Sequence, residues 1–269
     1  MTDLTHEFEN TLPLLDPLKH AEDSRDADVL RLVAAALAAD RARLAIQPVV
    51  YAADVTKPAF YEGLMRVLDN KGRIIPAAHF MPVVEATDLG RQIDVASLQL
   101  AFRLLVQNPQ IRLSINVSAR SLGDSRWRRA LTAGLAQKVA PGERLIFEIA
   151  ETSAMFLHEV LIQFMEDMQP RGVGFALDGF GAGLTSFRHL RDFMFDMVKI
   201  DKSYAKAVAR DADNQVLSEA LIGLSQQFGM LTVADGVESA ADAAFLQIAG
   251  ADCLQGYHFG VPKFLKRSE

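Results

Sequence analysis

The sequence has almost no cysteine, no long hydrophobic run and no excess of basic residues. Cys253 is the single cysteine in 269 residues, which excludes an intramolecular disulfide framework. The acidic start of the chain lacks both the basic and the apolar region of a secretory signal, so we expect a cytoplasmic protein. The longest nearly apolar run, residues 29–39, is broken by Arg31 and is well short of the roughly 20 residues that a membrane span needs. The sequence therefore predicts no membrane span.

The net charge of −6 comes from the first part of the chain. Residues 1–28 contain eight acids and two bases, and the remaining residues contain 26 of each. A balanced domain gives no electrostatic reason to expect DNA or an anionic membrane as a partner. We expect residues 1–28 to form an acidic, flexible N-terminal arm. Residues 29–269 should form one domain, because α/β barrels reach this size without dividing.

Downstream of the arm, short β-like runs alternate with longer segments of helical periodicity. Eight β-like runs are expected, at 44–51, 60–67, 112–118, 144–151, 173–180, 197–202, 231–238 and 253–260. Helices are expected at 28–43, 78–107, 124–138, 153–169, 184–194, 213–229 and 240–249. This alternation implies parallel strands with crossover helices, but the segment between the first two runs is too short for a crossover helix. We therefore predict an α/β fold, a modified (β/α)8 TIM-type barrel with an antiparallel first strand.

Seven of these runs carry a polar residue in an otherwise apolar context. They are Glu62, Asn116, Glu148, Asp178, Lys199, Asp235 and Gln255. In a barrel the functional residues gather at the C-terminal ends of the strands, and a buried acid is costly unless it is paired or bound to a metal. The first four are oxygen donors, which suit a hard cation such as Mg²⁺, Mn²⁺ or Ca²⁺. The six histidines show no zinc-type spacing.

Several polar residues have simpler explanations when each is taken alone. A single acid in a strand is often an edge charge or half of a structural ion pair. Glu151 has the position of a helix-entry residue. Arg126, Arg128 and Arg129, which flank Trp127, are most simply a solvated helix face. Only the combination of seven residues at equivalent positions favours a functional site.

Eight short motifs, in order along the chain, resemble the EAL-domain family of cyclic di-GMP phosphodiesterases. Between Leu44 and Pro262 they read IQPVV, EGLMR, INVS, EIAE, DGFGAG, KID, DGVE and QGYHFG. The resemblance implies that family's modified barrel and cyclic di-GMP as the ligand. It also implies that Mg²⁺ or Mn²⁺ is held by the four oxygen donors: Glu62, Asn116, Glu148 and Asp178.

The same resemblance implies roles for the other polar residues. Lys199 would help to activate the attacking water, and Asp235 would occupy a catalytic carboxylate position. Arg66, Gln47 and Gln255 would contact the cyclic dinucleotide. The carboxylate of Glu151 would hold the loop that follows Asp178, and hydrolysis in the family opens the ring to linear pGpG.

Three motifs depart from the family pattern. EAL becomes Glu62-Gly63-Leu64, which keeps the acid, and EGVE begins with Asp235, whose side chain is one methylene shorter. DDFG becomes Asp178-Gly179-Phe-Gly, so the carboxylate that the family uses for a second metal is missing. Loss of an electrostatic stabiliser typically costs about 10²–10³-fold in rate, and a misplacement of about 1 Å costs about 10²-fold. We therefore predict a domain that binds cyclic di-GMP, or a protein partner, with weak or absent phosphodiesterase activity.

Three other functions remain open from the sequence. The first is a working Mg²⁺- or Mn²⁺-dependent phosphodiesterase. The second is an enolase-like lyase that uses Lys199 beside a metal held by three of the strand residues. The third is a structural adaptor with a vestigial pocket. A homodimer is a further expectation, with contact candidates that could equally face the barrel: Phe187, Leu190, Phe193 and Phe195.

Overall fold

The computed structural model describes residues 17–137, 141–183 and 190–265, and its centre is a closed barrel of eight strands. The barrel order is β1-β9-β8-β7-β6-β5-β4-β2, and β1 also pairs with β2 to close it. β1 is antiparallel to both neighbours and the other pairs are parallel. The strands are β1 (Ala42–Tyr51), β2 (Pro58–Leu68), β4 (Leu113–Asn116), β5 (Leu145–Ala150), β6 (Gly174–Phe180), β7 (Met197–Ile200), β8 (Leu231–Ala234) and β9 (Cys253–Gln255). The predicted α/β barrel with an antiparallel first strand is confirmed.

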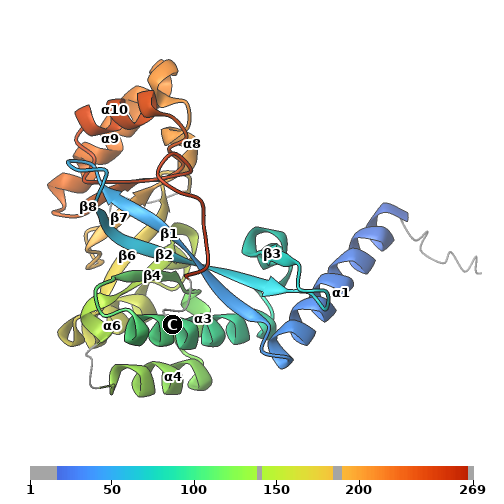
Figure 1. Ribbon diagram of the computed structural model, residues 1–269. Helices are drawn as coiled ribbons and strands as arrows, with labels where there is room; N and C mark the ends of the chain where they lie inside the picture. The colour runs from blue at the N-terminus through green and yellow to red at the C-terminus, as the bar shows by residue number, and fades with distance from the viewer. Residues whose placement is uncertain (1–16, 138–140, 184–189, 266–269) are drawn as a thin grey trace, which may run out of the picture.

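Helices cover the outside of the barrel (Figure 1). A short strand, β3 (Ile74–Pro76), lies outside the closed ring and pairs antiparallel with the last residues of β2. α3 packs against α1, α4, β1 and β4, while α9 packs against β7 and β8. The N-terminal part of α1 projects away from the barrel (Figure 1). The helices are α1 (Pro17–Ala38), α2 (Met81–Val84), α3 (Asp88–Gln107), α4 (Ser125–Leu135), α5 (Glu151–Phe156), α6 (His158–Met168), α8 (Lys202–Ala205), α9 (Ala212–Gln227) and α10 (Ala240–Ile248).

Aromatic residues fill the layer between the barrel and α4 and α6. Trp127 of α4 is fully buried, and its ring centroid lies 5.5 Å from Phe147 and 5.6 Å from Phe164. Two turns further along the same buried face of α4, Gly134 lies against the ring of Phe102, where any Cβ atom would overlap it. The α3–α4 crossing therefore needs a glycine at this position.

Helix boundaries differ from the sequence expectation because local caps interrupt the apolar periodicity. The predicted helix 78–107 is divided, since Thr87 caps α3 by accepting a hydrogen bond from Leu89 N–H. The helix predicted at 28–43 begins earlier, at Pro17, a residue favoured in the first turn, and ends before Asp40, whose φ is +49°.

Residues 1–16 of the predicted arm lie outside the described residues. Among the described helices, none combines the length and apolar character that crossing a bilayer demands.

The apolar segment that we considered for a dimer contact is used inside the chain. Leu190, Phe193 and Phe195 belong to the main hydrophobic core and are at most 7% exposed. Phe187 and most of the helix predicted at 184–194 lie outside the described residues. The three described residues are therefore core residues and do not offer a surface to a second copy.

Candidate functional site

The ammonium group of Lys199 lies at the centre of the carboxyl ends of the strands. Its Nζ atom donates to Glu62 Oε2 at 2.9 Å and to Glu148 Oε2 at 2.8 Å. Asp178 Oδ1 is 3.9 Å from the same nitrogen. Lys199, Glu62 and Glu148 come from β7, β2 and β5, and their side chains are nearly inaccessible, whereas one third of the Asp178 side chain is exposed. The barrel thus brings together four of the predicted site residues around one cation.

Amide and hydroxyl groups complete the contacts of the two buried acids. Asn116 Nδ2 donates to Glu62 Oε1 at 2.9 Å, and Gln255 Nε2 donates to Glu62 Oε2 at 2.5 Å. The hydroxyl of Ser114, which the sequence interpretation missed, donates to Glu148 Oε1. Every carboxylate oxygen of Glu62 and Glu148 therefore has a donor, which lowers the cost of burying two acids.

The charges of this cluster shift its pKa values in a consistent way. Burial and the charge of Glu62 raise the pKa of Glu148 to about 8, with Lys199 opposing. Burial also acts to raise the pKa of Glu62, but Lys199, Gln255 and Asn116 hold it below its ordinary value. Burial acts to lower the pKa of Lys199, but the surrounding carboxylates raise it well above its ordinary value. At all three residues the attraction between the ammonium and the carboxylates therefore opposes the effect of burial.

Asp235 lies at the edge of the same cluster. It follows β8, and its carboxylate accepts a hydrogen bond from Gly236 N–H at 2.7 Å. Burial raises its pKa, and the charge of Lys199 opposes that effect. The predicted catalytic carboxylate is thus close enough to Lys199 for their charges to interact.

The predicted ligand-contact residues divide into two groups. Gln47 and Gln255 are buried beneath Glu62: Gln47 Nε2 donates to Gly260 O at 3.0 Å, and its Oε1 accepts from Gln255 Nε2 at 3.4 Å. Arg66 is only half-buried, near the exposed ring of Tyr257. Burial lowers the pKa of its guanidinium group. Arg66 can meet a ligand, while the two glutamines support Glu62.

The loop after β6 contains the departure from the family pattern. Gly179 has a φ of +74°, and among the described residues outside its two chain neighbours no atom lies within 4 Å of the position that its Cβ would take. The backbone here therefore has room for a side chain but carries none. Further along, Glu151 Oε2 accepts a hydrogen bond from Gly183 N–H at 3.0 Å, so Glu151 contacts the loop as the resemblance implies.

A cavity of about 470 Å³ opens from the cluster toward α2 and α3. Its lining includes Glu62, Asn116, Glu148 and Asp178 of the cluster, together with Glu85, Asp94, Ser97 and Ser118. The lining is mostly apolar, with these acceptors set into it. Its size and composition are typical of a small-molecule site.

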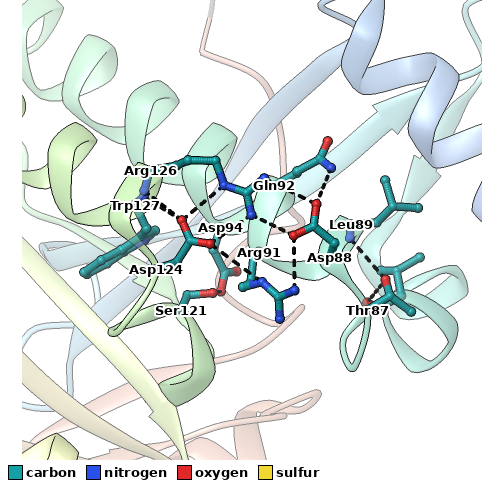
Figure 2. Close-up of polar contacts among 11 residues, drawn as sticks. Thr87, Asp88, Leu89, Arg91, Gln92, Asp94, Ser121, Asp124, Arg126 and Trp127 are labelled. Carbon is teal, nitrogen blue, oxygen red and sulfur yellow. Dashed lines mark hydrogen bonds and ion pairs between the residues drawn. The ribbon is translucent and has the colours of Figure 1, made fainter.

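Asp94 is the functional candidate that the sequence interpretation missed. It lies on α3, is 5% exposed, and its Oδ2 accepts from Ser121 Oγ at 2.6 Å and from Ser118 N–H at 3.1 Å. Figure 2 shows the contact with Ser121. Burial raises the pKa of Asp94 to about 7 despite these bonds. The sequence signal was an acid on the apolar face of a helix, between Ile93 and Ser97.

The donor set matches the chemistry of a hard cation. Carboxylate and amide oxygens of Glu62, Asn116, Glu148 and Asp178 line one cavity, and such oxygens are the ligands that a hard cation prefers. Among the described residues, however, no three acid, histidine or cysteine side chains converge at metal-ligand distances. The ammonium of Lys199 occupies the position between the carboxylates of Glu62 and Glu148. A metal ion bound there would have to replace the hydrogen bonds that Lys199 donates to these two carboxylates.

Comparison with known proteins connects this site to a family. The family model described as "EAL domain" matches residues 31–262. Cyclic di-GMP phosphodiesterase PdeB of Shewanella oneidensis is 30% identical over 243 residues, which is 86% of this chain and 28% of that protein. The chain therefore spans little more than a quarter of that relative.

Solved structures give the same result. The EAL domain of FimX from Pseudomonas aeruginosa, bound to cyclic di-GMP, superposes with a TM-score of 0.80 and 28% identity, covering 90% of this chain and 99% of that one. The EAL domain of FimX from Xanthomonas citri, also in complex with cyclic di-GMP, has a TM-score of 0.79 and 26% identity, covering 93% and 98%. With its barrel, its cluster and its motifs in agreement, this chain belongs to the EAL domain family.

Proposed function

We propose that this chain binds cyclic di-GMP in the cavity between the Lys199 cluster and α3, and that it hydrolyses the nucleotide weakly or not at all. The proposal is supported by the family, by two similar structures that contain the nucleotide, and by the pocket itself. A protein partner that responds to the bound nucleotide would complete the signalling role. The enolase-like alternative gains no support, because the family model that matches residues 31–262 is the EAL domain and an enolase-like lyase would leave the shared motifs unexplained.

Charged groups near and inside the pocket suit different parts of the nucleotide. The half-buried guanidinium of Arg66 is close enough to Glu62 for their charges to interact, and it would pair with an anionic phosphodiester. Within the pocket lining, Glu85 and Asp94 offer carboxyl groups among apolar residues of α2 and α3. Guanine presents N–H donors on its edge and a flat apolar face, so these residues fit a guanine base.

The observation that carries the weak-hydrolysis part is Gly179. The family pattern has a carboxylate here, and this chain has an open backbone position with no side chain. A bound Mg²⁺ or Mn²⁺ would polarise the phosphodiester and lower the pKa of a water. Glu62, Asn116, Glu148 and Asp178 would hold such an ion, and Lys199 would orient the water through its ammonium group. Without a carboxylate at position 179, the chain would offer one ligand fewer to a second ion and would stabilise the charge that develops during hydrolysis less well.

A working phosphodiesterase is the second candidate, and one specific observation favours it. The carboxylates of Glu62 and Glu148 each lie within 3 Å of the ammonium of Lys199 in a buried cluster, and Asp178 Oδ1 is 3.9 Å from the same nitrogen. Such preorganisation is what catalysis in this fold would need. If another ligand or a water takes the place of the missing carboxylate, turnover would persist.

Titration calorimetry with cyclic di-GMP, in the presence of Mg²⁺ and in the presence of a chelator, tests the proposal. We expect binding in both conditions and tighter binding with the ion. The same samples, incubated with Mn²⁺ and analysed for pGpG, should show turnover far below about 1 s⁻¹, an ordinary enzymatic rate. Absence of binding would support the adaptor alternative, and turnover at that ordinary rate would support the working enzyme.

A further inference from the structure

We infer that an ion-pair network on the surface, centred on Arg126, positions one wall of the nucleotide pocket. The wall segment is residues 117–124, which connects β4 to α4 and contributes Val117 and Ser118 to the cavity. The outer network consists of Asp88 and Arg91 of α3, Asp124, and Arg126 of α4 (Figure 2). The inference rests on the proposed function, because the pocket matters only if a ligand enters it.

The inner end of the wall segment is fixed to α3 by Asp94. Its carboxyl oxygen accepts from both Ser118 N–H and Ser121 Oγ–H, so one buried side chain holds two points of the segment. The residue before the segment is Asn116, which donates to Glu62. A shift of this end would move the pocket wall and a member of the Lys199 cluster together.

The outer end of the wall segment is fixed to the same helix by Arg126. Its guanidinium group donates to both carboxylate oxygens of Asp88, at 2.7 and 3.3 Å, and to Asp124 Oδ2 at 2.8 Å. Figure 2 shows Arg126 lying between the two acids. Asp124 also caps α4 by accepting from Arg126 N–H and Trp127 N–H. Arg126 thereby joins the first residue of α3 to the N-cap residue of α4.

The two ends are connected through a short hydrogen-bonded path. Ser121 O accepts from Asp124 N–H at 3.0 Å, and Ser121 Oγ–H donates to Asp94. Ala119 and Leu122 anchor this path in the core, at most 1% exposed, while Arg120 and Gly123 face the solvent. Because α3 holds the segment at both ends, loss of Arg126 leaves Asp94 at the inner end and the 3.7 Å ion pair between Arg91 and Asp124 at the outer end as side-chain contacts to that helix.

The competing explanation is that these ion pairs are an ordinary solvated surface. The side chains of Asp88 and Arg126 are 51% and 41% exposed, and exposed pairs contribute about 0.2–1 kcal/mol each. An effect of that size corresponds to a change in affinity of no more than about five-fold. The test must therefore separate a local effect on the wall segment from a general loss of stability.

Hydrogen exchange of the wall segment and affinity for cyclic di-GMP provide that test. We would compare wild type with Asp88→Asn, with Arg126→Gln and with the double variant, all in full-length protein at low salt. Exchange in residues 117–124 should rise, and the dissociation constant should increase by no more than about five-fold, in each single variant. The double variant should be no worse than either single variant, because both remove the same link. In about 1 M salt, wild type should approach the variants, since the Debye length falls to about 3 Å.

Asp54→Asn is the matched control. It removes an exposed ion pair of similar length, to Lys57 at 2.8 Å, but in the β1–β2 turn. This control should change neither the exchange of the wall segment nor the affinity. The inference is overturned if Asp88→Asn and Arg126→Gln leave the exchange of residues 117–124 at the level of the control. If wild type does not bind cyclic di-GMP at all, the proposed function fails, and the exchange result alone decides the role of Arg126.

Discussion

The protein contains two charge networks that share the same chemistry and differ in their contact with water. In the first, Lys199 is 2% exposed and lies between Glu62 and Glu148, which are 7% exposed or less. In the second, Arg126 is 41% exposed and lies between Asp88 and Asp124. Similar distances therefore occur in two very different dielectric environments.

The difference shows what each network can do. Buried charges interact strongly but are costly to leave unpaired, so the Lys199 cluster holds its geometry and depends on every member. Exposed charges interact weakly and are screened by salt, so the Arg126 network adds little stability and acts locally. Asp94 lies between the two networks. Its buried carboxylate holds the inner end of residues 117–124, which follows Asn116 of the Lys199 cluster, and Arg126 fixes the outer end of the same segment.

The largest expected effect comes from breaking the buried network. Lys199→Met should lower the free energy of unfolding by about 3–5 kcal/mol, because it leaves Glu62 and Glu148 without the cation that pairs them. Urea denaturation measures the change. Mn²⁺ should stabilise this variant more than wild type, since the two carboxylates become free to bind it. Lys206→Met is the control: its ion pair with Glu238 is exposed, and the loss should be below about 1 kcal/mol. Equal losses would contradict the distinction between the networks.

An intermediate effect is expected for Asp94, as a dependence of stability on pH. Its pKa in the folded state is about 7, above the ordinary value of 3.8, so the folded state binds the proton more tightly. The contribution to stability is therefore fully present below pH about 4 and is lost as pH rises to about 7. Asp94→Asn should flatten the stability curve in this range, by as much as about 4 kcal/mol. Identical curves for variant and wild type would mean that Asp94 ionises normally.

The smallest effect is expected for the outer network. Arg126→Gln should lower the free energy of unfolding by less than about 1 kcal/mol, and the loss should disappear in about 1 M salt. The loss from Lys199→Met should persist in the same salt, because a buried pair is little screened. Chemical denaturation at two salt concentrations compares them. If the loss in the free energy of unfolding caused by Arg126→Gln did not depend on salt, the guanidinium of Arg126 would be less exposed to solvent than the structure indicates.

The barrel could be predicted from the sequence because its strands are continuous apolar runs, each interrupted by one polar residue. Glu62, Glu148, Asp178 and Lys199 stood out for that reason, and their strands bring them together. Asp94 did not stand out, because a helix face tolerates an occasional acid and burial cannot be read from periodicity. The ion pair between Arg126 and Asp88 could not be predicted either. The two residues are 38 positions apart in the sequence, and only the packing of α3 on α4 brings them together.

Helix boundaries and small elements were less predictable, since single residues decide them. The split before α3 depends on the side chain of Thr87, and β3 is a three-residue strand that exists only because β2 offers it a free edge. The core position of Phe193 and Phe195, rather than a dimer surface, depends on tertiary packing. Local sequence preference does not contain that information.

The most direct test of the central claim is the rate of pGpG formation, with Mn²⁺, by wild type, Gly179→Asp and Gly179→Asn. Aspartate and asparagine both tolerate a positive φ, and position 179 has space for a side chain. If the missing carboxylate limits hydrolysis, Gly179→Asp should raise turnover by about 10²-fold and Gly179→Asn should not. Turnover by wild type at about 1 s⁻¹, with no gain in Gly179→Asp, would contradict the account.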